Sequence, residues 1–173
     1  MKFQFSCITE DSSCAIDDAE IKLNKTYQLI KRKNLKLADY LWNKRSINYE
    51  TMWEIALAGL KRNVVWTDVA GKDHSDGTEV KTGTFAYVVN GNSYSYCVTI
   101  GNINTKTGNL KIVLYNPRAG CHYFVFIPKE DVSYVLSTET NRGVMRFSLP
   151  QPGKNPTGRW VNYVTDFDNF IKL

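Results

Sequence analysis

The chain has 173 residues, a formal net charge of +5 and a sequence pI near 9.0. Hydrophobic residues make up 43% of it and aromatic residues 13%, which excludes a disordered chain and predicts a single domain over residues 1–173 with a sizeable core. No apolar run is long enough to cross a bilayer, and the N-terminal residues lack the pattern of a secretory signal, so we expect a cytoplasmic protein with no membrane partner. The modest positive charge suits a polyanionic partner.

The first third of the chain has the apolar spacing of amphipathic helices. Apolar residues recur mostly at helical intervals from residue 15 to about residue 42, and Asn34 is a candidate for dividing this stretch into two helices. A further helix is expected to begin at Ser46, Asn48 or Tyr49 and to end at residues 62–63.

The same stretch is rich in basic residues. Eight Lys and Arg residues follow position 20 with only Asp39 opposing them, at positions 22, 25, 31, 32, 33, 36, 44 and 45. Such a stretch is suited to contact DNA phosphates, although a solvated helix face is its more common explanation.

From residue 64 onward, strand signals dominate. Residues 64–66 and 78–82 are expected to form the two arms of a hairpin around the Asp-Gly turn at 76–77, and Asn90-Gly91 predicts a second hairpin between strands at 82–89 and 93–100. Strands are also expected at 110–115 and 121–127, followed by a short helix at 129–137, a loop at 137–158 and an amphipathic helix at 160–173. The pattern predicts an α/β (or α+β) fold: a mixed central sheet with antiparallel hairpins, N-terminal helices on one face and a C-terminal helix.

Residues 64–85 gather four acidic residues, one histidine and two lysines between two apolar runs. Strand alternation places Glu79 and Lys81 on one face and Val80 on the other. If the first arm of the hairpin brings Asp68 alongside, two carboxylates and a lysine share one small volume. Carboxylate and carbonyl oxygens suit Mg²⁺, and an ammonium stabilises the charge that develops when a phosphodiester is cut.

Asp68, ten intervening residues and then Glu79-Val80-Lys81 resemble the PD-(D/E)XK nuclease superfamily, which includes most type II restriction endonucleases. Thr67 stands where a proline often precedes the first acid of that motif. The resemblance implies an endodeoxyribonuclease that depends on Mg²⁺, with Mn²⁺ as an alternative, and hydrolyses phosphodiester bonds of double-stranded DNA. It also implies a homodimer, whose symmetry mirrors that of a palindromic site.

The resemblance assigns a role to each residue of the motif. Asp68, Glu79 and the Val80 carbonyl would hold the metal, and Lys81 would position or activate the attacking water. Asp76 is the reserve metal ligand and catalytic acid, and Asp73 is the third candidate for the first acidic position.

Other residues are expected to assist. An acid on the helix before the motif, Glu54 or its alternative Glu50, would help the metal site, and His74 would serve as a proton carrier or phosphate contact. Basic residues in turns and loops are candidates for contacts with DNA: Arg118, Arg142, Arg146, Lys154 and Arg159.

Two other functions stay open. The chain is alternatively a non-catalytic nucleic-acid-binding domain with an incidental Glu-x-Lys, or a structure-specific DNA or RNA nuclease on the same fold. An Asp-Gly turn followed by a charged strand is also typical of any solvated hairpin. Five strand tyrosines are candidates for a platform that stacks on bases, although core or rim packing is their usual role: Tyr87, Tyr94, Tyr96, Tyr115 and Tyr123.

Overall fold

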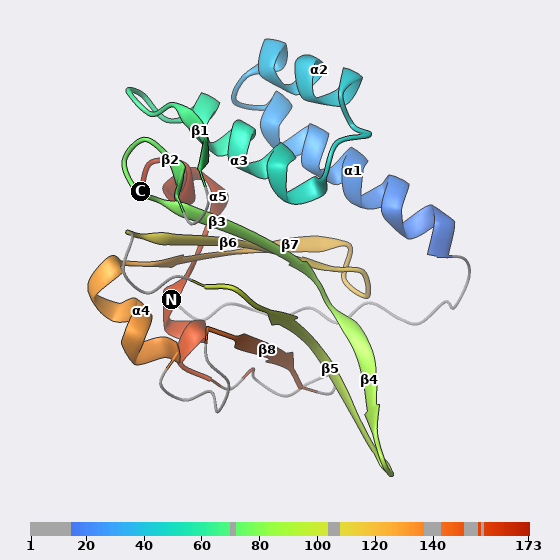
Figure 1. Ribbon diagram of the computed structural model, residues 1–173. Coiled ribbons are helices and arrows are strands. Elements are labelled where there is room, and N and C mark those ends of the chain that lie inside the picture. The colour runs from blue at the N-terminus through green and yellow to red at the C-terminus, as the bar shows by residue number, and fades with distance from the viewer. Residues whose placement is uncertain (1–14, 70–71, 104–107, 137–142, 151–155, 157) are drawn as a thin grey trace.

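A computed structural model describes residues 15–69, 72–103, 108–136, 143–150, 156 and 158–173 (Figure 1). It has the expected α+β fold, with N-terminal helices covering one face of a mixed central sheet and a smaller antiparallel sheet packed on the opposite face. Two hydrophobic cores lie on either side of the central sheet. None of the helices in these residues is long and apolar enough to cross a membrane.

Three helices form the first layer: α1 (Ala15–Lys31), α2 (Leu35–Asn43) and α3 (Tyr49–Leu60). The Asn34 side chain accepts a hydrogen bond from the Leu37 N–H at 3.0 Å and so caps α2, which confirms the division predicted at this residue. Asn48 caps α3 in the same way by accepting from the Glu50 N–H. The apolar side of α3, including the fully buried Trp53, packs toward the central sheet.

The central sheet has the strand order β3-β6-β7-β9. Its strands are β3 (Glu79–Thr84), β6 (Leu110–Asn116), β7 (Cys121–Ile127) and β9 (Val164–Thr165). β3 is parallel to β6, with Glu79 opposite Leu110, whereas the other pairs are antiparallel. Every residue of β6 is buried because helices cover one of its faces and the second sheet covers the other.

The second sheet has the order β4-β5-β8 and is formed by β4 (Ala86–Asn90), β5 (Ser93–Ile100) and β8 (Met145–Leu149). The turn predicted at Asn90-Gly91 is confirmed, but the strand predicted at 82–89 is divided between β3 in the central sheet and β4 in this one. β4 and β5 project from the body of the molecule as an arm (Figure 1). The two sheets approach closely at Gly83, where a Cβ would lie 2.5 Å from Val98 Cγ2. The short helix α4 (Lys129–Leu136) follows β7 where the sequence predicts it.

One predicted hairpin is wrong. The strand β1 (Trp66–Val69) pairs with β2 (Lys72–His74), not with the strand that begins at Glu79. The Thr78 carbonyl accepts from the N–H groups of both Asp73 and His74, which closes a tight turn in which Gly77 has φ 88°. The chain then leaves this turn as β3 and pairs in parallel with β6.

The last part of the chain also differs from expectation. Residues 145–149, predicted to lie in a loop, form β8 and pair with β5. The helix predicted over residues 160–173 is a 3₁₀ helix η1 (Arg159–Tyr163), the short strand β9 and the single-turn helix α5 (Phe167–Phe170). Pairing of β9 with β7 draws Val164 and Thr165 into the sheet, which prevents one continuous helix.

A polar cluster joins α1, α3 and β7. His122 Nε2 lies 2.9 Å from the Tyr49 hydroxyl and 3.3 Å from the Thr26 hydroxyl, and these hydroxyls are 3.0 Å apart. Burial raises the pKa of Tyr49 to about 12. Burial lowers the pKa of His122 to about 3, and the charges of Lys22 and Lys25 add to this effect. Both side chains are therefore neutral at neutral pH.

We expect the protein to lose stability as the pH falls below the ordinary histidine pKa of 6.5, because the unfolded chain then binds a proton that buried His122 does not. His122 alone should account for about 2 kcal/mol of the free energy of unfolding between pH 7 and pH 5. In urea unfolding, the free energy of unfolding of His122→Gln should change between pH 7 and pH 5 by about 2 kcal/mol less than that of the wild type. Buried His74 is present in both proteins and cancels. An equal pH dependence in the two proteins would contradict the prediction.

Candidate active site

β3 is an edge strand of the central sheet, and carboxylates from two other elements bind its backbone. Glu50 Oε2, from the first turn of α3, accepts the Thr82 N–H at 3.0 Å, and Asp73 Oδ2, from β2, accepts the Val80 N–H at 2.7 Å. These two N–H groups are two residues apart and therefore point the same way along the strand. The two carboxylates fasten α3 and the β1-β2 hairpin to β3.

Lys81 lies among these acids. Its Nζ is 3.4 Å from Glu79 Oε1 and 3.6 Å from Glu50 Oε1. The Glu79 side chain is only 3% exposed, whereas Val80 belongs to the core beneath the helices, as strand alternation predicts. Burial by itself lowers the pKa of Lys81, but the charges of Glu50 and Glu79 outweigh it, so that the pKa is raised. Lys81 is therefore an ammonium at neutral pH.

Glu54 lies one helical turn after Glu50 and faces the β1-β2 hairpin. Its Oε2 accepts a hydrogen bond from Trp66 Nε1 at 2.9 Å. Burial raises the pKa of Glu54, and the charges of Asp73 and Glu50 raise it further. His74 Nε2 lies 2.8 Å from the Glu54 carbonyl oxygen, and burial lowers the pKa of this histidine. Neutral His74 thus holds the hairpin against α3 by donating to that carbonyl.

The structure brings together five of the residues singled out in the sequence: Glu50, Glu54, Asp73, Glu79 and Lys81. Asp76 lies apart from Lys81. Its Oδ2 is 3.2 Å from Lys61 Nζ, and its Oδ1 accepts the Thr78 N–H. Burial alone would raise the pKa of Asp76, but the hydrogen bonds from Thr78 and Lys61 lower it.

The acid that reaches β3 is Asp73, whereas the expected order was Asp68, Asp76 and then Asp73. Asp68 lies in β1, and its side chain is outside the described part of the structure. The expected order followed from pairing the Asp68 strand with the Glu79 strand, a pairing that the fold does not contain. Asp73 takes the place beside β3 because β2, not β1, leads through the turn into that strand.

Glu50 is the helix acid in direct contact with Lys81, although Glu54 was the stronger candidate. The two glutamates are four residues apart and therefore share one side of α3. The spacing of four residues is visible in the sequence, and it predicts that Glu50 and Glu54 both face the same neighbouring elements.

The donors present fit a hard divalent cation in kind, because Glu50, Glu54, Asp73 and Glu79 offer only carboxylate oxygens. Among the described residues, no three Asp, Glu, His or Cys side chains lie close enough together to hold an ion as they stand. The ammonium of Lys81 contacts both Glu50 and Glu79 and occupies the space between them. Binding of a cation by these two glutamates therefore requires Lys81 to move from one of them.

Three of the arginines proposed for DNA contacts interact with the protein itself. The Arg118 guanidinium lies 3.9 Å from the Tyr96 ring centroid, and Arg146 donates to the Ser95 hydroxyl. Arg159 lies over the ring of Tyr134. The other two proposed residues, 142 and 154, lie outside the described residues.

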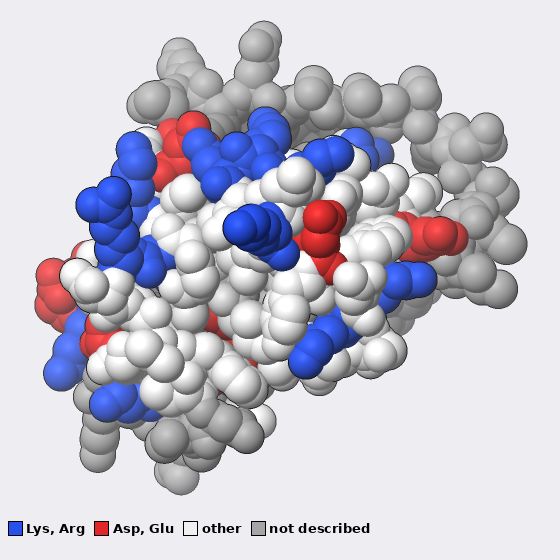
Figure 2. Space-filling view, turned by 90° about the horizontal axis from the view of Figure 1, so that it is seen from above, with Lys and Arg blue, Asp and Glu red and all other residues white. Residues whose placement is uncertain are grey.

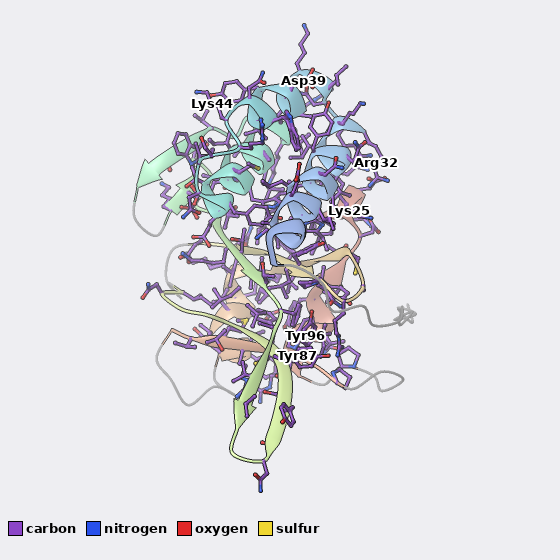
Figure 3. The ribbon with its side chains drawn as sticks, turned by 90° about the vertical axis from the view of Figure 1, so that its right-hand side faces the viewer. Lys25, Arg32, Asp39, Lys44, Tyr87 and Tyr96 are labelled. Atoms are coloured by element: carbon purple, nitrogen blue, oxygen red, sulfur yellow. The ribbon has the colours of Figure 1, made fainter. Side chains whose placement is uncertain are left out.

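A basic face lies elsewhere, on α1 and α2. Seen from above these helices, several separate groups of Lys and Arg side chains lie on a largely uncharged surface, with a few acidic groups among them (Figure 2). Lys25 lies on α1, Arg32 directly follows the last residue of α1 and Lys44 directly follows α2, and all three are exposed (Figure 3). Asp39, the acid in this stretch, accepts a hydrogen bond from the Tyr27 hydroxyl at 2.8 Å. The basic face continues toward β3, because Lys22 Nζ donates to Thr84 Oγ1 at 3.4 Å.

The chain matches no protein-family model, and no curated protein or solved structure matches it. The function of the site is therefore inferred from its own residues.

We expect Lys81→Met to lower the free energy of unfolding by roughly 3 kcal/mol at pH 7, because it leaves the buried carboxylate of Glu79 without its counter-charge. Adding Glu79→Gln to this variant should restore most of the loss, since the uncompensated charge is then gone. The measurement is urea unfolding of the two single variants and the double variant.

Lys72→Met, at an exposed position of β2, serves as the control and should change the free energy of unfolding by less than about 0.5 kcal/mol. If Lys81→Met and the double variant were equally destabilised, the role of Lys81 would be packing and not charge compensation.

Proposed function

We propose that the protein is a Mg²⁺-dependent endodeoxyribonuclease that hydrolyses phosphodiester bonds of double-stranded DNA, as sequence-specific type II restriction endonucleases do. Mn²⁺ is the alternative ion. The observation that carries the proposal is the grouping of Glu50, Glu54, Asp73 and Glu79 around one ammonium, that of Lys81. Four carboxylates and a single lysine leave an excess of negative charge, which a cation would balance.

The position of the cluster adds support. Its members come from α3, β2 and β3, so three packed elements fix the side chains. The Lys81 side chain is 17% exposed and that of Glu50 is 31% exposed, which leaves both within reach of a ligand at the edge of β3. Lys22 binds Thr84 at the end of the same strand and links this edge to the basic face of α1.

Each residue has a part in the proposed reaction. Glu79 and Asp73, with Asp68, are the acids that would hold Mg²⁺, which when bound supplies a Lewis acid and a more acidic water. Lys81 Nζ would hold a nonbridging phosphate oxygen or the attacking water and stabilise the negative charge that develops at phosphorus. Water adds to phosphorus as the bond to the leaving oxygen breaks. Glu54, whose raised pKa favours proton uptake, would accept the proton of that water.

The main alternative is a nucleic-acid-binding domain without catalysis. It is favoured by the hydrogen bonds of Asp73 and Glu50 to backbone N–H groups, since these acids already serve to cover the edge of β3. In that case the basic face of α1 and α2 carries the function alone, and the cluster around Lys81 is a structural ion-pair network. A structure-specific DNA or RNA nuclease at the same site is the other alternative.

Cleavage separates these functions. Purified protein should cut unmethylated phage and plasmid DNA into discrete fragments in Mg²⁺, and EDTA should abolish cutting. Glu79→Gln and Asp73→Asn should each lower the rate by at least about 100-fold. Asp76→Asn, which changes an acid bound to Lys61, should keep most of the activity once folding is verified by circular dichroism.

Two results would overturn the catalytic assignment. One is that the wild type cuts no duplex, branched or single-stranded DNA or RNA. The other is that Glu79→Gln cuts as fast as the wild type. If the protein cut only branched DNA or only RNA, the proposed active site would stand and the proposed substrate would be wrong.

If the basic face binds DNA, the affinity for duplex DNA should depend on its Lys and Arg residues. For duplex DNA, the slope of log K against log salt should fall by about 0.9 for each phosphate that the double variant Lys25→Gln, Arg32→Gln no longer neutralises. Lys129→Gln, at an exposed position of α4, should leave the slope unchanged. Fluorescence anisotropy at several salt concentrations measures the slope, and an unchanged slope in the double variant would place the DNA on another surface.

A further inference from the structure

The arm formed by β4 and β5 carries large apolar side chains that are exposed in the described part of the chain. Tyr87 is 61% exposed, Val88 39%, Val89 58% and Tyr94 75%. The arm projects away from the body of the molecule (Figure 1). A group of large apolar residues on a projecting element marks a surface that another molecule covers.

The arm also has an open edge. In the order β4-β5-β8, β4 is an outer strand, and no other strand within the described residues pairs with its free side. The backbone N–H and C=O groups on that side are therefore available to a further strand. Pairing at such an edge gives both backbone hydrogen bonds and contacts between side chains.

The composition of the arm favours a protein partner over nucleic acid. Residues 86–100 contain no Lys, Arg, Asp, Glu or His, and the two arginines that contact them from other elements, Arg118 and Arg146, are already bound to the hydroxyls of Tyr87 and Ser95. Figure 3 shows Tyr87 and Tyr96 of the arm far from Lys25, Arg32 and Lys44 of the basic face. The proposed stacking platform also loses two of its five members, because Tyr96 and Tyr115 are buried.

β4 is complementary to a second copy of itself. An antiparallel pair related by a two-fold axis through Val88, the middle residue of the strand, places Tyr87 of each copy opposite Val89 of the other. Pairs of an aromatic and a β-branched residue stabilise antiparallel strands. The absence of charge means that no like charges meet across the axis. The two three-stranded sheets would join into one continuous sheet with the order β8-β5-β4-β4-β5-β8.

The arm is held in shape before any partner binds. At its base, the Arg118 guanidinium lies over the Tyr96 ring and Arg118 Nη1 donates to the Tyr87 hydroxyl at 3.2 Å. On β8, Arg146 Nη2 donates to the Ser95 hydroxyl at 2.8 Å. An element fixed in this way loses little conformational freedom when it pairs.

We infer that two copies of this chain associate through antiparallel pairing of their β4 strands about a two-fold axis at Val88. The inference rests on the arm alone and does not depend on the proposed chemistry. The contact involves one short strand and few side chains from each copy, so it belongs among the smaller protein interfaces and should depend on concentration in the micromolar range.

Sedimentation velocity of the full chain, from roughly 1 to 200 μM, tests the inference. The wild type should shift from monomer to dimer over this range. Val88→Lys and Val88→Glu should each raise the dissociation constant at least about 10-fold, because two like charges would meet at the axis. An equimolar mixture of the two variants should restore the dimer, since opposite charges then face each other. Leu35→Lys, at an exposed position of α2, is the matched control and should dimerise like the wild type.

A wild type that stays monomeric throughout, or a Val88→Lys variant that dimerises as well as the wild type, would overturn the inference. Failure of the mixture to dimerise would do the same when both variants have the circular dichroism spectrum of the wild type. A monomeric wild type whose binding to single-stranded DNA is weakened by Tyr94→Ala would identify the arm as a base-stacking surface instead. Sedimentation tests the interface and the cleavage assay tests the nuclease, so the two proposals can fail separately. A protein that dimerises but cuts no nucleic acid would contradict only the proposed nuclease activity. A protein that cuts DNA but stays monomeric would contradict only the proposed interface.

Discussion

The hydrogen bonds from the N–H groups of Val80 and Thr82 to the carboxylates of Asp73 and Glu50 determine how the candidate site is built. β3 is bonded to β6 on one side only, and an edge strand with unsatisfied N–H groups invites pairing with another chain. Carboxylates satisfy these donors, exclude a further strand and hold α3 and β2 in place. The grouping of acids near Lys81 is thus a consequence of how the edge of the central sheet is closed.

Charge compensation by Lys81 determines how much stability the protein loses by burying these acids. A buried carboxylate such as Glu79 is tolerated because an ammonium lies 3.4 Å away. Burial and neighbouring acids act in the same direction on Glu54 and raise its pKa, whereas for Lys81 the acids oppose burial. One lysine is shared among several acids, so the cluster retains negative charge beyond what Lys81 neutralises. The same arrangement is suited to a structural ion-pair network and to a site that binds a cation.

The sequence predicts features that depend on neighbouring residues. The cap at Asn34, the turn at Asn90-Gly91 and the shared face of Glu79 and Lys81 follow from local conformational preferences and strand alternation. The errors concern pairings between distant segments: β3 with β6, β5 with β8 and β7 with β9. The placement of Asp73 beside β3 depends on the pairing of β1 with β2 and on the turn that leads from β2 into β3. Periodicity reveals which side of a strand is apolar but does not identify the strand beside it.

Gly83 joins the two halves of the molecule mechanically. It lies in β3 two residues after Lys81 and immediately before the chain crosses into the arm, and Val98 of β5 fills the space that a side chain at this position would occupy. Val98 Cγ2 already occupies the place of a Cβ at position 83, so a larger residue there would push β3 and β5 apart. Because Lys81 lies two residues before Gly83 on the same strand, such a displacement would also move the strand that holds Glu79 and Lys81.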